Sequence, residues 1–201
     1  MARYEPHDKF YRKAREQGLP SRAAFKLEEL IARFRLVKPG ARVADLGCAP
    51  GGWLAVLAGA VGPHGRVVGV DLAVARAPWP NVIALAGDIR EPATREAVAR
   101  ELGGAADLVT SDLSPKLTGI VDRDHALSFE LLMVALDFAR VVIRPGGTMV
   151  TKLFMGGDFP EITAAFARAF AKVEVARTKA SRPGSSELYL VARDFRGPAA
   201  G

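Results

Sequence analysis

Cysteine and histidine are scarce in this sequence. The chain of 201 residues contains one cysteine, Cys48, and three histidines. A single cysteine excludes an internal disulfide and is typical of a reducing compartment, so we expect a cytoplasmic protein. The few candidate ligands are scattered without the spacing of a metal site, and we therefore expect no metal.

Long hydrophobic runs are also absent. The chain is 49% hydrophobic and 25% charged, as in ordinary globular domains, but no apolar run reaches the roughly 18 residues of a membrane span. The polar N-terminal residues do not resemble a signal peptide. The length supports one core and is short for two. We expect a monomer with a single domain over residues 1–201, made of a basic arm (1–20) and a core (21–196), and no membrane partner.

Acidic residues are in deficit. The sequence has 22 Asp and Glu against 28 Lys and Arg, a net charge of +6, which suggests a polyanionic partner. The bases are concentrated in residues 1–42, where Tyr4, Phe10 and Tyr11 lie among them, and in residues 177–182. Bases mixed with aromatics can hold phosphates and stack on unpaired nucleobases. The same aromatics could instead hold the arm against the domain, and the sequence leaves both interpretations open.

Three of the 20 glycines lie close together in one informative stretch at residues 45–53. The apolar run 42–46 predicts a buried strand, and a helical pattern follows the stretch. Strand–loop–helix units of this kind hold nucleotide-like cofactors at the carboxyl end of the first strand. The glycines of the loop allow a tight turn and a close approach to a ligand. They are Gly47, Gly51 and Gly52.

The same loop lacks the features of a dinucleotide site. Its glycines do not follow the G-x-G-x-x-G pattern, and Pro50 removes one amide donor. Asp45, just before the first glycine, favours a cationic ligand over a phosphate. S-adenosylmethionine carries a sulfonium and an ammonium group and no phosphate. The alternative is an ordinary α/β turn with solvated acids.

Two further acids argue against that alternative. The apolar run 66–70 ends in Asp71, at the offset of roughly twenty residues where an acid bonds a ribose diol in nucleotide-binding folds. The run 82–85 leads to Asp88 and Ile89, which we place at an adenine edge. Together the three strand-end features predict a nucleoside cofactor.

Strand and helix patterns alternate along the chain, which predicts an α/β fold with a mostly parallel sheet and helices on both faces. We expect Ser21 to cap the first helix and Pro145–Gly147 to form a sharp stop before the fifth strand. The short last connection predicts a hairpin with a final antiparallel strand. The expected strands are 42–46, 66–70, 82–85, 106–112, 148–154, 173–177 and 187–192. The expected helices end near residues 34, 61, 102, 143 and 170. The fourth helix is expected to begin at residue 124 and the fifth at residue 160.

Four charged residues lie in or beside apolar strands and helices, where a charge is costly unless it is paired. Two acids and two lysines could form a structural ion-pair cluster. The position of two of them at strand carboxyl ends, beside the cofactor loop, favours a catalytic cluster instead. The four residues are Lys26, Asp112, Lys152 and Glu187.

Five motifs give the sequence a close resemblance to the FtsJ/RrmJ family of S-adenosylmethionine-dependent RNA ribose 2′-O-methyltransferases. The resemblance covers residues 11–193 and implies a Rossmann-like methyltransferase fold with a final antiparallel strand. It departs after Pro115, where many bacterial members continue with Asn and this chain has Lys116–Gly119. The motifs are Ser21–Leu27, Asp45–Trp53, Ser111–Pro115, Val150–Phe154 and Ser185–Tyr189.

The resemblance also implies residue roles. The family's catalytic tetrad falls on Lys26, Asp112, Lys152 and Glu187. From the chemistry of methyl transfer to a hydroxyl we expect Lys152 to accept the proton and no metal to take part. The cofactor is S-adenosyl-L-methionine. The family's cofactor residues fall on Gly51, Trp53, Asp71, Asp88 and Asp112. With their neighbours in the loop and at the strand ends, the expected cofactor-binding residues are Gly47, Pro50, Gly51, Gly52, Trp53, Asp71, Leu72, Asp88, Ile89 and Asp112.

The role of Lys152 has an alternative. A lysine is ordinarily charged at pH 7 and then cannot accept a proton. Burial and the charge of Lys26 would lower the pKa of Lys152, whereas Asp112 and Glu187 would oppose that shift. Lys152 could instead stay charged and stabilise the developing alkoxide. The sequence leaves both roles open.

The resemblance to bacterial members of this size implies 23S ribosomal RNA of the 50S subunit as substrate, with a uridine of the A-loop as target, in ribosome biogenesis. The alternatives are an RNA- or ribosome-binding assembly factor with little activity, and a methyltransferase acting on another RNA, a base nitrogen or a protein. The Asp112–Pro115 loop lacks the aromatic residue that would hold a flipped base, which disfavours a base-nitrogen enzyme.

Overall fold

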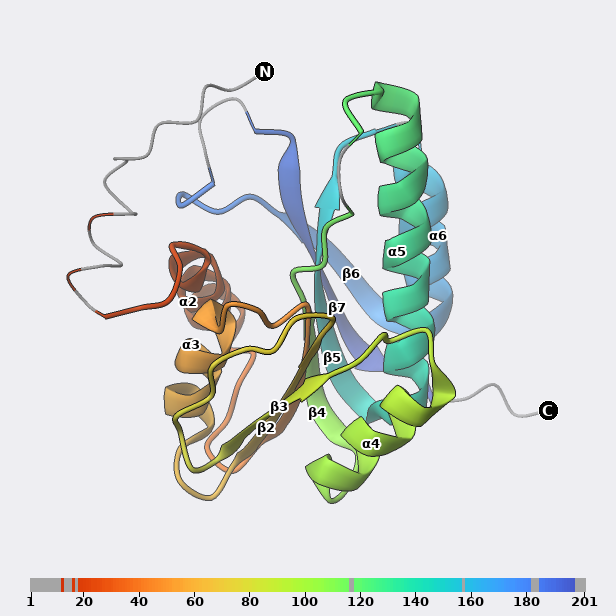
Figure 1. Ribbon diagram of the computed structural model, residues 1–201. Coiled ribbons are helices and arrows are strands. Elements are labelled where there is room, and N and C mark those ends of the chain that lie inside the picture. Colours follow the sequence, from red (N-terminus) through yellow and green to blue (C-terminus); the bar gives the residue numbers. More distant parts are fainter. Residues whose placement is uncertain are drawn as a thin grey trace.

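The computed structural model describes Arg12, Glu16 and residues 18–115, 118–156, 158–181 and 185–197, arranged as in Figure 1. Most of the arm predicted at residues 1–20 lies outside these ranges. The helices are α2 (Ala23–Phe34), α3 (Gly52–Val61), α4 (Pro92–Leu102), α5 (Val121–Val142) and α6 (Phe159–Ala169). The strands are β1 (Arg42–Leu46), β2 (Arg66–Asp71), β3 (Val82–Ala86), β4 (Ala106–Ser111), β5 (Ile143–Phe154), β6 (Phe170–Ala176) and β7 (Glu187–Phe195).

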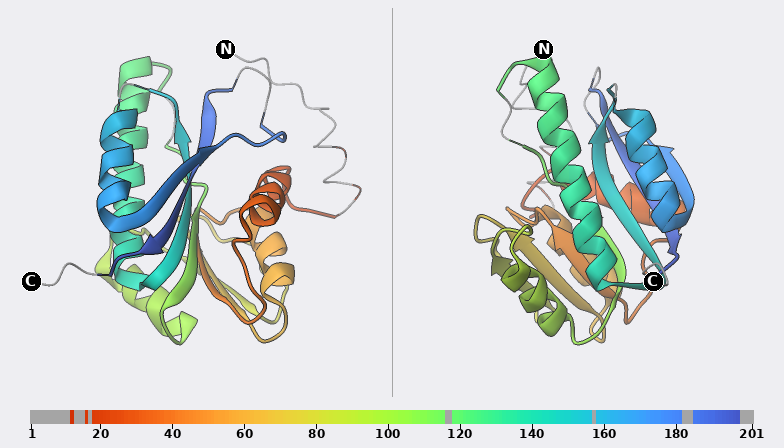
Figure 2. Two further views of the ribbon diagram at one scale, coloured as in Figure 1. Left: turned by 180° about the vertical axis from the view of Figure 1, so that it is seen from behind. Right: turned by 90° about the vertical axis from the view of Figure 1, so that its right-hand side faces the viewer.

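The strands form one sheet in the order β3-β2-β1-β4-β5-β7-β6. Strands β1 to β5 pair in parallel, whereas β7 runs antiparallel to both β5 and β6. Helices α2 and α3 cover one face of the sheet, and α4, α5 and α6 cover the other (Figures 1 and 2). This architecture confirms the predicted α/β fold with a mostly parallel sheet. The final antiparallel strand lies inside the sheet, between β5 and β6.

Both faces of the sheet are buried, which explains why its strands are almost uninterrupted apolar runs. Neighbouring residues of β1 point to opposite faces. Val43 packs in the hydrophobic cluster under α2 and α3, and Ala44 packs in the cluster under α4, α5 and α6. With both faces covered, the carboxyl ends of the strands are the place where polar residues gather. In the described part of the chain, no helix is long and apolar enough to cross a membrane.

The predicted boundary before β5 is wrong. β5 begins at Ile143, so the Pro145–Gly147 stretch lies within the strand and is not a stop. The register with β4 shifts between the pairs Ala106–Ile143 and Leu108–Thr148, so a bulge takes up the extra residues. Proline and glycine are tolerated at such bulges, and composition alone cannot distinguish a bulge from a turn.

The predicted cap of the first helix is also wrong. The N-cap of α2 is Arg22, and no side chain makes a capping hydrogen bond. The Ser21 carbonyl oxygen accepts a hydrogen bond from the Ala24 amide at 3.3 Å. The Ser21 hydroxyl instead approaches α3, because a Cβ built on Gly52 would lie 2.2 Å from Ser21 Oγ. Ser21 therefore packs α2 against α3.

The topology brings distant residues to one edge of the sheet. Because β7 is antiparallel, its first residue, Glu187, pairs with the last residue of β5. Glu187 therefore lies at the same edge as Asp112, which follows β4, and Lys152, near the end of β5. Helix α2 is held nearby by Trp53 Nε1, which donates a hydrogen bond to the Ala23 carbonyl at 2.9 Å.

Candidate active site

Two lysine–carboxylate pairs meet at the carboxyl edge of the sheet. Lys26 Nζ, on α2, lies 2.7 Å from Glu187 Oε1 and 2.8 Å from Glu187 Oε2. Lys152 Nζ, on β5, lies 3.0 Å from Asp112 Oδ1 and donates a hydrogen bond to the Asp112 carbonyl oxygen at 2.8 Å. The structure thus brings together the four charged residues singled out in the sequence.

The pairs are largely shielded from solvent. The exposed fractions of the side chains are 10% for Lys26, 13% for Glu187, 9% for Lys152 and 21% for Asp112. Burial raises the pKa of Glu187, but the charge and the hydrogen bond of Lys26 lower it. A hydrogen bond from Ser181 Oγ at 2.9 Å and the charge of Lys152 lower it further, so this pKa lies below its ordinary value. Glu187 is therefore ionised at neutral pH and fixes the Lys26 ammonium.

Asp112 contacts both Lys152 and an adjoining cavity. Its Oδ1 atom is buried and lies within ion-pair distance of Lys152 Nζ, but it finds no hydrogen-bond partner among the described residues. The ammonium hydrogen bond goes to the Asp112 carbonyl oxygen instead. Asp112 also lines the cavity. One carboxylate therefore serves both parts of the site.

Tyr189 belongs to the same cluster but is missing from the residues predicted from the sequence. Its hydroxyl donates a hydrogen bond to Glu187 Oε1 at 3.4 Å, and its ring lies 6.0 Å from the Trp53 ring. Burial, followed by the charges of Asp112 and Glu187, raises its pKa, so the hydroxyl stays protonated. The sequence did carry a signal, because residues two apart in a strand share a face. Tyr189 therefore faces the tetrad together with Glu187.

The adjoining cavity has a volume of about 550 Å³. It is bounded by the loop after β1, the ends of β2, β3 and β4, and one side of α5. Because Asp112 belongs to its lining, the cavity reaches the Lys152 pair. The predicted cofactor residues that line it are Gly47, Asp71, Leu72, Asp88, Ile89 and Asp112.

This lining suits a positively charged nucleoside derivative. Asp71 Oδ2 accepts a hydrogen bond from the Ala49 amide, and Asp71 Oδ1 accepts one from the Ala73 amide, each at 3.0 Å. Each carboxylate oxygen can accept a second bond, so Asp71 can still hold the two hydroxyls of a ribose. Asp88 adds a second acid, and Leu72, which is 75% exposed, offers an apolar surface to a flat ring.

Gly47 meets the predicted need for a tight turn. Its φ is +75°, a value that side-chain-bearing residues rarely adopt. A Cβ at this position would lie 3.0 Å from Leu113 Cδ2 and 3.1 Å from Leu113 N. Glycine therefore lets the loop after β1 pack closely against the segment that follows β4.

Other predicted cofactor residues are not part of the lining of this cavity. Pro50 is exposed, whereas Gly51, Gly52 and Trp53 are buried in the contact between the loop, α2 and α3. Gly52 makes room for Ser21, and Trp53 binds the first turn of α2 through the Ala23 carbonyl. Gly52 and Trp53 therefore contact the start of α2, which carries Lys26.

Asp45 does not face a ligand, contrary to the sequence-based interpretation. Its side chain is fully buried, and Oδ1 accepts a hydrogen bond from Thr110 Oγ1 at 2.7 Å. Burial, together with the charges of Asp112 and Asp71, raises the pKa of Asp45 to about 8, although the Thr110 hydrogen bond lowers it. The carboxyl group is therefore mostly neutral at pH 7 and belongs to the interior of the sheet.

The sequence also matches known proteins. The model of the FtsJ-like methyltransferase family matches residues 19–195. This chain belongs to that family. The prediction of an FtsJ/RrmJ-type protein is thereby confirmed, and so is the expectation that this FtsJ-like methyltransferase is an enzyme.

Relatives with curated names cover almost the whole chain. "Ribosomal RNA large subunit methyltransferase E" of Anaeromyxobacter dehalogenans is 45% identical over 200 residues, which are 98% of this chain and 74% of the relative. The protein of the same name from Myxococcus xanthus is 43% identical over 199 residues, 98% of this chain and 93% of the relative.

Solved structures share the fold. A ribosomal RNA methyltransferase from Plasmodium falciparum has a TM-score of 0.76 and 26% identity, and the match covers 89% of this chain and all of that one. Fibrillarin from Aeropyrum pernix, solved with bound S-adenosyl-L-methionine, has a TM-score of 0.58 at 18% identity, over 78% of this chain and 68% of that one. The second likeness shows the Rossmann-like fold alone.

Family membership confirms the prediction of S-adenosylmethionine as the cofactor of this FtsJ-like methyltransferase. The acids and the apolar surface of the 550 Å³ cavity fit a nucleoside that carries positive charge. Six residues of the cavity lining were predicted to bind it, and they are Gly47, Asp71, Leu72, Asp88, Ile89 and Asp112.

Proposed function

We propose that this methyltransferase modifies a ribose 2′-hydroxyl in ribosomal RNA of the large subunit. The observation that carries the proposal is the shared position of Asp112, which pairs with Lys152 and also lines the cofactor cavity. A hydroxyl group that approaches Lys152 Nζ therefore lies beside that cavity. The names of the relatives support ribosomal RNA as the substrate.

Methylation of an alcohol forms a carbon–oxygen bond and releases a proton. When bound, S-adenosylmethionine supplies a methyl group on a positively charged sulfur. Asp112 holds Lys152 Nζ through its side chain and its carbonyl oxygen, which directs the nitrogen toward the incoming hydroxyl. We assign to Lys152 the acceptance of the hydroxyl proton, for which its ammonium group first gives up a proton to solvent. The O–H electron pair stays on the oxygen that becomes methylated.

The alternative role for Lys152 is charge stabilisation. A charged Lys152 would stabilise the oxygen as its negative charge develops, and the proton would pass to water. Arginine keeps the charge but cannot accept a proton, and it also has another shape. Comparison of Lys152→Arg with Lys152→Ala therefore separates the two roles when both variants stay folded.

The second ion pair positions the other lysine. Glu187 accepts hydrogen bonds from Ser181 Oγ and the Tyr189 hydroxyl while it pairs with Lys26. The carboxylate is thus fixed from several sides, and it fixes the Lys26 ammonium in turn. We assign to Lys26 and Glu187 the orientation of the ribose beside Lys152.

The surface beside the tetrad supports a polyanionic substrate. The Lys179 amide donates a hydrogen bond to Glu29 Oε2 of α2 at 2.8 Å, and Arg22 Nη2 donates one to the Ala180 carbonyl at 3.3 Å. The described part of the connection between β6 and β7 therefore lies against α2. It adds the exposed Arg177 and Lys179 to the bases of α2, and we propose that they form one rim that binds RNA phosphates.

The specific target that we propose is a uridine in the A-loop of 23S ribosomal RNA, in the 50S subunit, modified by a cytoplasmic monomer. This part rests on the resemblance of the motifs to bacterial members of the family. The departure at Lys116–Gly119 bears on substrate contacts, and its first two residues lie outside the described ranges.

The test is methyl transfer to large-subunit ribosomal RNA by Lys152→Ala, Lys152→Arg and the wild type. We expect both variants to lose at least about 100-fold in rate, the lower end of general-base catalysis, while calorimetry shows unchanged S-adenosylmethionine binding. Lys172→Ala, at an exposed lysine of β6, is the control and should keep full activity. Substantial activity in Lys152→Arg alone would favour charge stabilisation, and an active Lys152→Ala would remove Lys152 from the reaction.

A further inference from the structure

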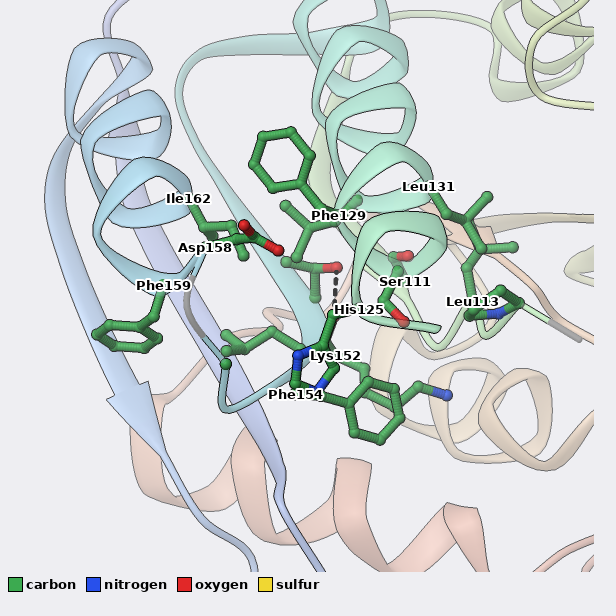
Figure 3. Close-up of a pocket in the computed structure, with 16 residues that line it drawn as sticks. Ser111, Leu113, His125, Phe129, Leu131, Lys152, Phe154, Asp158, Phe159 and Ile162 are labelled. Carbon is green, nitrogen blue, oxygen red and sulfur yellow. Dashed lines mark hydrogen bonds between the residues drawn. The ribbon is translucent and has the colours of Figure 1, made fainter. Parts of the chain in front are cut away.

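A second, narrower cavity opens beside Lys152. Figure 3 shows it between the ends of β4 and β5 and the N-terminal parts of α5 and α6, with His125, Lys152 and Phe154 gathered on one side. Its volume is about 30 Å³, which is room for one or two water molecules. Any larger group must therefore lie at its mouth and not inside it.

Phe154 lines this cavity without belonging to the core. Neither of the two large hydrophobic clusters beside the sheet includes it, and its side chain is only partly buried. It follows Lys152 by two positions in β5, so both side chains point to the same face. Lys152 Nζ lies 6.0 Å from the centre of the Phe154 ring. A partly exposed aromatic ring thus stands next to the group that we assign to the reaction.

We propose that the Phe154 ring stacks against the base of the nucleotide whose ribose is methylated, an inference that rests on the function proposed above. The base and the 2′-hydroxyl are attached to neighbouring carbon atoms of the same ribose. A ribose at Lys152 Nζ therefore carries its base within reach of the ring. Aromatic side chains stack on any nucleobase, because each base has a π face.

Polar groups around the same cavity can meet the edge of a stacked base. His125 and Ser128 come from α5, and Asp158 comes from the residue before α6. They offer both donors and acceptors. Stacking combined with hydrogen bonds to the base edge is the usual way in which unpaired RNA bases are recognised. The site would therefore hold an unpaired nucleotide and reject one that remains stacked in a duplex.

The experiment compares enzyme variants on two RNAs. The first is a short large-subunit ribosomal RNA fragment that contains the nucleotide methylated by the wild type. In the second, that nucleotide keeps its ribose and 2′-hydroxyl but has no base. The enzymes are the wild type, Phe154→Ala, Phe154→Tyr and Met155→Ala. Met155 is the matched control, because it adjoins Phe154, is 51% exposed and does not line the cavity.

Methyl transfer is measured at sub-saturating RNA, with thermal unfolding and S-adenosylmethionine affinity as checks of the fold. Loss of one stacked base should cost roughly 10- to 100-fold. The wild type, Phe154→Tyr and Met155→Ala should each lose this factor on the RNA without the base. On the intact RNA, the methylation rate of Phe154→Ala should already be below that of the wild type by a similar factor. Its rate should fall little further on the RNA without the base.

The inference is wrong if removal of the base lowers the methylation rate of Phe154→Ala by the same factor as that of the wild type. The ring and the base would then act independently. If Phe154→Ala does not fold, Phe154→Leu takes its place, since leucine keeps apolar volume without a flat ring. A wild type that methylates no ribose in any ribosomal RNA would instead refute the proposed function. If the wild type methylates a ribose but the ring and the base act independently, only the proposed stacking is refuted and the proposed function stands.

Discussion

Asp45 illustrates how surroundings decide the charge of a single residue. In the sequence it lies beside the glycine loop, where an acid could face a cationic ligand. In the structure it is fully buried, bonded to Thr110 and near the charges of Asp71 and Asp112. The cavity acids Asp71 and Asp112 are therefore better placed than Asp45 to interact with a positively charged cofactor.

The buried carboxyl group makes stability depend on pH. The pKa of Asp45 is about 8 in the folded protein, whereas an unperturbed Asp has a pKa of about 3.9. Between these values the folded state binds more protons than the unfolded state, so this contribution to stability falls as pH rises. Asp45→Asn should therefore gain stability relative to the wild type from about pH 4 to about pH 8, by on the order of a few kcal/mol in total.

Urea unfolding at several pH values across that window measures this difference. Asp137→Asn is the control, because Asp137 has a side chain that is 58% exposed on α5. Its stability difference from the wild type should change little over the same range. A difference between Asp45→Asn and the wild type that is constant with pH would contradict the assignment of a neutral, buried carboxyl group.

Sequence reasoning at the residue scale succeeded where a side chain was out of place for its strand. Lys152 and Glu187 were conspicuous as charges in apolar strands. Tyr189 was not, because a tyrosine in an apolar strand looks like an ordinary core residue. Trp53 is a different case, because its indole donates a hydrogen bond to the Ala23 carbonyl and does not line the cavity, so its predicted contact with the cofactor stays a prediction.

At the scale of elements, α2 and the connection between β6 and β7 pack against each other. They contact each other through Glu29 and Lys179 and through Arg22 and Ala180. Both elements also reach the tetrad, because Lys26 lies on α2 and Ser181 bonds Glu187. A substrate bound by the exposed bases of these elements would be held beside the reacting groups.

Neutralising the rim should weaken RNA binding without changing the methylated position. Arg177→Gln combined with Lys179→Gln removes two exposed bases. If each contacts one phosphate, the slope of log affinity against log salt should flatten by about 1.4–1.8. Fluorescence anisotropy with a ribosomal RNA fragment at several salt concentrations measures both quantities. Arg182, the third base of the basic segment 177–182, lies outside the described residues.

The matched control neutralises Arg168 and Lys172, two exposed bases of α6 and β6 outside the rim. This variant should bind RNA with the wild-type affinity and salt slope. If the Arg177 and Lys179 double variant also behaves like the wild type, the connection between β6 and β7 is ordinary solvated surface and the rim does not exist.

The order of the elements was predictable because each buried strand and amphipathic helix repeats a pattern that its surroundings require. The details that failed depend on contacts between elements. The bulge in β5 depends on its register with β4, and the packing of Ser21 depends on Gly52 of α3. Neither contact can be seen in the residues of one element alone.

At the scale of the whole molecule, the fold brings residues that are far apart in the sequence together at one site. Lys26 and Glu187 are separated by 161 positions in the sequence and are in direct contact. The cofactor cavity and the narrow cavity beside Phe154 both open at the carboxyl edge, and Leu113 and Pro115 line both. We propose that the molecule holds a cofactor, a ribose and a base around the pair formed by Lys152 and Asp112.

The most direct test of this account identifies the atom that receives the methyl group. Ribosomal RNA from cells that lack this protein is incubated with the purified protein and S-adenosylmethionine carrying a labelled methyl group, and is then digested with alkali. A 2′-O-methyl group blocks alkaline cleavage of the adjacent phosphodiester, because the attacking hydroxyl is gone. The account predicts label in alkali-resistant dinucleotides from the large-subunit RNA. Label on the base of a single nucleotide, with none in resistant dinucleotides, would contradict it.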